Sequence, residues 1–120
     1  MKKQVLFIHG GEVFSRYTNY IKFISDYKLD LNKKKPKKWK HSLSDKLGRN
    51  YEVIMTEMPC ALNSKYKEWK IWFEKYIPFL KSPVILVGYS LGAIFLVKYL
   101  SENKLKKKIK GTFLVAATYE

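Results

Sequence analysis

The chain has 120 residues, of which 47% are hydrophobic and 16% aromatic, and it carries a formal net charge of +14. This length fits one domain with a modest core, and this apolar content excludes an intrinsically disordered chain. The longest apolar run, at 91–97, is too short to span a membrane. No small-residue cleavage site follows the first apolar stretch, and the single cysteine, Cys60, cannot form an internal disulfide. We therefore expect one domain over residues 1–120, located in the cytoplasm.

The positive charge is carried almost entirely by lysine, since Arg16 and Arg49 are the only arginines. Arginine is favoured for bidentate phosphate and base contacts, so its scarcity argues against specific nucleic-acid binding. The most basic stretch, at 28–40, contains KKKPKKWK, with a proline that interrupts regular structure. We interpret it as an exposed insertion. The alternative is a polybasic contact for anionic lipid or RNA, with Trp39 as an apolar anchor.

The first half of the chain predicts two strands and two helices. The continuous apolar run Gln4–Ile8 is typical of a strand buried on both faces, and the turn His9-Gly10-Gly11 closes it. Apolar residues at helical spacing predict a helix over Tyr17–Tyr27. A short helix over 39–48 follows the basic insertion, and a second strand is expected at Tyr51–Thr56. The short helix rests on Trp39, Leu43 and Leu47, and Gly48 ends it.

The second half continues the alternation. A long helix is expected over Ser64–Leu80, capped by Asn63 or Ser64. Val84–Val87 then predicts a fully apolar strand, followed by a helix over Leu91–Glu102. A lysine-rich connection leads to a last strand at Thr112–Ala116. The buried face of the long helix is expected to consist of Tyr66, Trp69, Phe73, Ile77 and Leu80.

Strands that alternate with helices at this spacing indicate βαβ units and a parallel sheet. Right-handed crossovers with helices on both faces give a three-layer α/β sandwich with strand order 2-1-3-4 in chain numbering. The apolar last strand would form an edge of that sheet, and a bare apolar edge invites pairing with a second copy. We therefore expect self-association through this strand.

The pentapeptide Gly88-Tyr89-Ser90-Leu91-Gly92 has the G-x-S-x-G form of a nucleophile elbow, between an apolar strand and an apolar helix. Such a turn exposes the Ser90 Oγ in a strained conformation, while small residues at 88 and 92 let strand and helix backbones approach. The simpler interpretation is a loop serine that caps the helix. Capping, however, does not require a glycine on each side.

The turn His9-Gly10-Gly11 is the second element of the candidate site. Adjacent parallel strands would bring it beside Ser90, where a backbone N–H of the turn and that of Leu91 would bind an oxyanion. We expect Gly11 to be the donor from this turn, with Glu12 as the alternative, and His9, Gly10, Gly88, Tyr89 and Gly92 to shape the site. By itself, this turn is also compatible with an ordinary glycine turn after a strand.

The segments Lys3–Gly11 and Pro83–Val97 resemble the corresponding segments of α/β-hydrolases. The pattern is most similar to small, lidless bacterial serine hydrolases related to the retinoblastoma-binding-protein-9 family. This resemblance implies a carboxylesterase-like enzyme that cleaves a small ester, thioester or amide through an acyl-enzyme on Ser90. It also implies no cofactor. The histidines show no metal-ligand spacing, so we expect no metal.

A serine nucleophile needs a histidine base and an acid, which in this fold follow the serine along the chain. After Ser90 the sequence offers only Glu102 and Glu120, and no histidine. We expect the missing pair to lie beyond residue 120, so that this chain is a truncated α/β-hydrolase fold. His41 and Asp45, four residues apart, are more simply a surface pair. The alternative function is a non-catalytic interaction protein whose lysine-rich segments, 33–40 and 104–110, bind an anionic partner.

Overall fold

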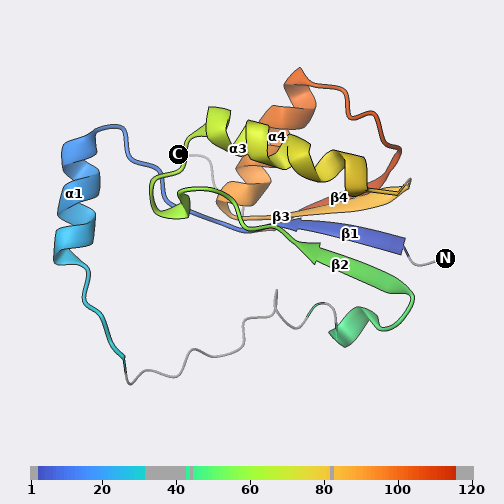
Figure 1. Ribbon diagram of the computed structural model, residues 1–120, viewed down its shortest axis with the longest axis horizontal. Helices are drawn as coiled ribbons and strands as arrows, with labels where there is room; N and C mark the ends of the chain where they lie inside the picture. The colour runs from blue at the N-terminus through green and yellow to red at the C-terminus, as the bar shows by residue number, and fades with distance from the viewer. Residues whose placement is uncertain (1–2, 32–42, 44, 82, 116–120) are drawn as a thin grey trace.

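Four parallel strands form one sheet in the order β2-β1-β3-β4 in the computed structural model, which describes residues 3–31, 43, 45–81 and 83–115 (Figure 1). The strands are β1 (Lys3–Ile8), β2 (Tyr51–Met55), β3 (Val84–Tyr89) and β4 (Ile109–Val115). β1 and β3 occupy the centre, and their apolar runs are almost completely buried. The α/β class and the strand order expected from the sequence are both confirmed.

The strand β4 begins three residues earlier than expected. The sequence places its start at Thr112, whereas the structure starts it at Ile109, within the lysine-rich stretch. The backbone N–H of Val84 donates to the Lys108 carbonyl at 2.9 Å, which ties this stretch to the sheet. An edge strand can carry lysines because one side of it faces solvent, so a lysine-rich sequence does not exclude strand structure there.

Two helices, α3 (Tyr66–Tyr76) and α4 (Leu91–Glu102), cover one face of the sheet (Figure 1). The helical residues 43 and 45–47 lie below the opposite face in the same view. The helix α1 (Tyr17–Asp26) stands clear of the sheet, and none of its residues is buried. The apolar spacing therefore predicted that this helix forms, but not where it packs. No helix in the described part of the chain is long and apolar enough to cross a membrane.

The helix expected over Ser64–Leu80 is shorter and is capped differently. The α-helical part ends at Tyr76, and a 3₁₀ turn, Ile77–Phe79, follows because Pro78 has no N–H to continue the α-helical ladder. The cap prediction was wrong: Lys65 is the N-cap residue and makes no side-chain cap bond. Asn63 ends a preceding 3₁₀ turn that begins at Ala61.

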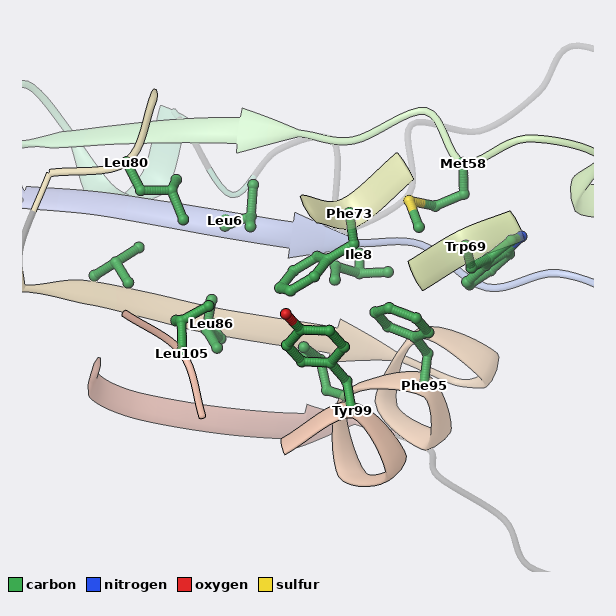
Figure 2. Packing of buried hydrophobic residues seen from close by; sticks show 12 residues of the cluster. Leu6, Ile8, Met58, Trp69, Phe73, Leu80, Leu86, Phe95, Tyr99 and Leu105 are labelled. Atoms are coloured by element: carbon green, nitrogen blue, oxygen red, sulfur yellow. The ribbon is translucent and has the colours of Figure 1, made fainter. Parts of the chain in front are cut away.

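The main core lies between the sheet and the helices α3 and α4 (Figure 2). Phe73 and Phe95 meet edge to face with ring centroids 5.3 Å apart, and Phe73 meets Tyr99 at 4.8 Å. Such edge-to-face pairs favour contact between the positive edge of one ring and the negative face of the other. The buried members of this cluster are Leu6, Ile8, Met58, Trp69, Phe73, Leu80, Val84, Leu86, Phe95, Leu96, Tyr99 and Leu105.

A smaller apolar cluster lies on the opposite face of the sheet. Val5, Phe7 and Val87 are buried there, and Leu43 and Leu47 pack against them. The short helix predicted from the spacing of these two leucines is therefore present in its described part. Gly48 follows it with φ of 79°, a left-handed conformation typical of the residue after a helix. Trp39, which completed the predicted pattern, lies outside the described residues, as does most of the basic insertion.

A hydrogen bond joins the two covering helices, because the Tyr99 hydroxyl donates to a Glu74 carboxylate oxygen at 3.0 Å. Burial, together with this carboxylate, raises the pKa of Tyr99 to about 12. A phenol whose pKa is higher in the folded state stabilises the fold below pH 10, and this stabilisation is lost as the pH rises from 10 to 12. We expect Tyr99→Phe to be less stable than the wild type at pH 9.

The same substitution should also reduce the fall in stability above pH 10. Urea unfolding at pH 9 and pH 11.5 measures both effects, and the difference between wild type and variant removes the contribution of the many lysines. If both proteins lose the same stability over this interval, Tyr99 does not titrate as proposed.

Candidate active site

Ser90 lies at the junction between β3 and α4, and its backbone is strained. Its φ of 54° and ψ of −116° fall outside the regions that non-glycine residues normally occupy. The Ser90 N–H donates to the Val115 carbonyl at 2.8 Å, and the Ser90 carbonyl accepts from the N–H groups of Ala93 and Ile94. These bonds hold the strained conformation at the N-terminus of α4, where the helix dipole favours negative charge. The half-exposed Ser90 side chain is thus placed where an anionic intermediate would be stabilised.

The glycines on either side of Ser90 are required by contacts between backbones. A Cβ atom at Gly92 would overlap the Ile8 carbonyl, so helix α4 could not approach β1 as closely as it does. A Cβ atom at Gly88 would lie 2.7 Å from the Ala93 Cα. The half-buried Tyr89 between Gly88 and Ser90 packs against the smaller apolar cluster. The turn therefore depends on small residues at the positions where the sequence has them.

The turn after β1 lies beside Ser90. β1 and β3 are hydrogen-bonded neighbours, with Ile8 opposite Gly88, so both strands end at the same edge of the sheet. A Cβ atom at Gly10 would lie 3.3 Å from the Ser90 Cβ. The structure thus brings together two motifs that are about eighty positions apart in the sequence.

The backbone N–H groups of Gly11 and Leu91 are the predicted oxyanion donors. Neither the Gly11 N–H nor the Leu91 N–H donates a backbone hydrogen bond to any other residue in the described ranges. The Glu12 N–H, which the sequence left as the alternative to Gly11, donates to the Ala61 carbonyl at 2.7 Å and is therefore occupied. Of the two donors considered in this turn, Glu12 is thus excluded, and Gly11 stays a prediction.

The segment between β2 and α3 holds this turn in place, and sequence reasoning did not identify it. The Met58 N–H donates to His9 Nε2 at 2.9 Å, and the Ser64 N–H donates to the Glu12 carbonyl at 2.7 Å. A Cβ atom at Gly11 would lie 2.7 Å from the Ser64 Oγ and 3.2 Å from Trp69 Cζ2. No local sequence signal marks these contacts, because they join residues about fifty positions apart.

His9 shapes the turn and has no lone pair free to act as a base. Since the Met58 N–H can only donate, Nε2 must be the accepting nitrogen, and the proton resides on Nδ1. Nδ1–H then donates to the Gly10 carbonyl at 2.6 Å. The ring also meets Trp69 edge to face, with centroids 5.7 Å apart. One nitrogen is therefore used within the turn and the other by Met58.

The other ionisable candidates lie away from Ser90 or outside the described residues. Glu102 is the last residue of α4, roughly 18 Å along the helix from Ser90 at 1.5 Å per residue. Asp45 is exposed, and its predicted partner His41 is outside the described ranges, as is Glu120. Cys60 is an exposed free thiol in a left-handed conformation. Within the described residues, no group of three His, Cys, Asp or Glu side chains is placed to hold a metal ion.

Comparison with known proteins supports a hydrolase. A family model described as serine hydrolase matches residues 30–119. The crystal structure of the ydeN gene product from B. subtilis is similar to this chain, with a TM-score of 0.59 and 21% sequence identity. That alignment covers 97% of this chain and 52% of the other, so the chain spans about half the length of that protein. At this identity the likeness shows the fold alone. No curated protein gives a significant match.

Proposed function

Because the chain belongs to the serine hydrolase family, we propose that Ser90 is the nucleophile of a carboxylesterase-like site that cleaves a small ester, thioester or amide. The observation that carries this proposal is the strained backbone of Ser90, held at a helix N-terminus beside the Gly10-Gly11 turn. Strain of this kind persists only where the surrounding structure over-determines it, and it concentrates at active sites.

The reaction would proceed in two steps. Ser90 Oγ attacks the carbonyl carbon and gives its proton to a base, while the N–H groups of Gly11 and Leu91 bind the oxyanion. The C–O, C–S or C–N bond then breaks, and the leaving group takes the proton from the base. Water, deprotonated by the same base, releases the acid and regenerates Ser90. None of these steps requires a cofactor.

The base must come from elsewhere, since both nitrogens of His9 are engaged in hydrogen bonds. We propose that a histidine and a carboxylate outside these 120 residues complete the site, in agreement with the order of catalytic residues in this fold. The 120-residue chain would then contain the nucleophile and the oxyanion donors but react slowly by itself.

Labelling of Ser90 with a fluorophosphonate, with and without added imidazole, tests this proposal. Imidazole supplies the missing base, so we expect it to accelerate labelling by at least about tenfold, because general-base catalysis contributes 10²–10⁴-fold. Ser90→Ala should abolish the labelling. Ser101→Ala, which changes an exposed serine on the same helix, should not affect it. If a folded chain shows no imidazole-dependent labelling, Ser90 is not in a reactive geometry.

The alternative is a binding protein for an anionic partner, and the lysines near β4 favour it. Lys104, Lys106 and Lys108 are exposed. Lys3 and Lys110 lie close together, and hydrogen bonding to Lys3 and the charge of Lys3 lower the pKa of Lys110. A bound anion would relieve this repulsion. Unlike the hydrolase proposal, this alternative predicts no dependence of Ser90 labelling on imidazole.

We further propose that the edge of β4 is a site of self-association. Phe113 and Leu114 are 58% and 45% exposed, respectively, on this edge strand. Sedimentation at increasing concentration should show dimers or larger species. A lysine on an edge strand opposes pairing with a second sheet, so Phe113→Lys should shift the protein toward monomer. Val97→Lys, which adds the same charge to an exposed position on α4, should not. A wild-type protein that remains monomeric at high concentration would refute this proposal.

A further inference from the structure

A cavity of about 160 Å³ lies between the N-terminal ends of α3 and α4 and is lined by Leu91, the residue after the proposed nucleophile. The loop after β1 forms one wall and the two helices form the others. The apolar residues that line it are Val13, Tyr66, Trp69, Leu91, Ile94 and Phe95. Figure 2 shows Trp69 and Phe95 near each other at the carboxyl-terminal end of the central strands, and their ring centroids are 5.9 Å apart.

The cavity lies next to both residues proposed as oxyanion donors, Leu91 and Gly11. Leu91, which lines the cavity, directly follows Ser90 in the chain. Ser64 and Trp69 also line the cavity. Both lie against Gly11, since a Cβ atom added at Gly11 would lie within 3.2 Å of each. A substrate carbonyl bound by the N–H groups of Gly11 and Leu91 would therefore hold its acyl chain close to this cavity.

The size and lining of the cavity limit what it can hold. A dry apolar cavity of about 150 Å³ in another protein is large enough for benzene. A cavity of this volume accommodates an acyl chain of about four to six carbons. Each methylene group moved from water into such a lining should tighten binding by about fourfold.

The charge at the rim restricts the ligand further. Lys65 and Lys98 border the cavity, and the Lys98 ammonium lies 4.3 Å from the centroid of the Tyr66 ring. None of the described residues that line the cavity carries a carboxylate. A cationic chain would therefore meet two like charges and no carboxylate among these lining residues.

We propose that this cavity binds the acyl group of the substrate, an uncharged chain of about four to six carbons. This inference rests on the proposed function of Ser90, because it is the reaction at Ser90 that makes the ligand an acyl group. Binding in the cavity, however, requires no catalysis and can be measured separately.

Titration of the ¹⁵N-labelled 120-residue chain with butanamide, hexanamide and hexylammonium tests the proposal by NMR. We expect amide shifts concentrated at Val13, Leu91 and Ile94, and hexanamide should bind about fifteenfold more tightly than butanamide. Hexylammonium should bind at least tenfold more weakly than hexanamide. Ile94→Trp, which fills the cavity, should abolish the shifts, whereas Val97→Trp, at an exposed position one turn along α4, should retain them.

If Ile94→Trp does not fold, Val13→Trp replaces it, because Val13 is 60% exposed and the substitution leaves the core intact. Shifts that are absent, scattered over the surface, or unchanged in the filled variants overturn the proposal. Hexanamide binding without imidazole-dependent labelling of Ser90 would leave the cavity established and the hydrolase function refuted. Imidazole-dependent labelling of Ser90 without hexanamide binding would support the hydrolase function and refute the acyl-binding cavity.

Discussion

Replacing Gly92 by alanine is expected to lower the free energy of unfolding by about 3 kcal/mol or more, which is at or above the upper range for overpacked sites. The added Cβ would overlap the carbonyl oxygen of Ile8, a backbone atom that cannot rotate away as a side chain can. Relief requires α4 to move away from β1. That movement would disturb both the main core and the position of Ser90.

Urea unfolding followed by circular dichroism measures this loss, with Gly111→Ala as the matched control. A Cβ atom at Gly111 would meet only the Phe113 ring, at 3.4 Å, so this variant should lose less than about 1 kcal/mol. If the two variants are equally stable, α4 does not approach β1 as closely as described. Imidazole-dependent labelling of Ser90 should fall with Gly92→Ala and persist with Gly111→Ala.

Replacing Trp69 by alanine is expected to cost about 3–5 kcal/mol, the range for loss of a large buried aromatic side chain. Trp69 is 1% exposed, contacts Phe95 and His9 with its ring, and donates from Nε1 to the Pro59 carbonyl at 3.0 Å. The substitution removes these contacts together and leaves the Pro59 carbonyl without its donor. It also removes a wall of the acyl cavity.

The control for Trp69 lies three residues away on the same helix. Trp72 is 39% exposed, so Trp72→Ala should cost less than about 1.5 kcal/mol. Thermal or urea unfolding of the two variants compares a buried and a half-exposed tryptophan of equal size. Equal losses would mean that Trp69 is not the centre of the packing between α3 and α4.

The candidate site combines a serine turn that is local in the sequence with supporting contacts that are not. Ser90 and Leu91 belong to a single turn, whose glycines allow the backbone to approach the neighbouring strand. The second proposed oxyanion donor, Gly11, belongs to another turn, and the residues that hold that turn come from a third segment, between Met58 and Ser64. A substitution in this third segment should therefore reduce the reactivity of Ser90, although the substituted residue does not contact Ser90.

Much of the fold follows from local patterns that the sequence displays directly. The apolar runs at β1 and β3 are long enough to be buried on both faces, and this burial requires the centre of a parallel sheet. The glycine–serine–glycine turn after β3 and the glycine turn after β1 were both recognisable before the structure, because each is a short contiguous motif. Parallel pairing of β1 with β3 then predicts that these turns lie side by side.

Other features were decided only by tertiary contacts. The spacing of apolar residues in α1 predicted a helix, yet no residue of that helix is buried. Periodicity identifies the apolar face of a helix but not the surface on which that face packs. Asn63 and Ser64 looked like helix caps, but the hydrogen bond from the Ser64 Oγ to the Ala61 carbonyl commits that side chain to the preceding turn.

The sequence by itself determined the α/β class and the strand order and singled out Ser90 as the candidate nucleophile, since these depend on runs and motifs of a few consecutive residues. The tertiary structure alone decided that His9 is locked in the turn, that Glu12 is unavailable as a donor, and that a cavity opens beside Leu91. Each of these depends on atoms from segments about fifty to eighty positions apart. Local propensities and periodicity cannot specify such contacts, because they arise only when the helices pack on the sheet.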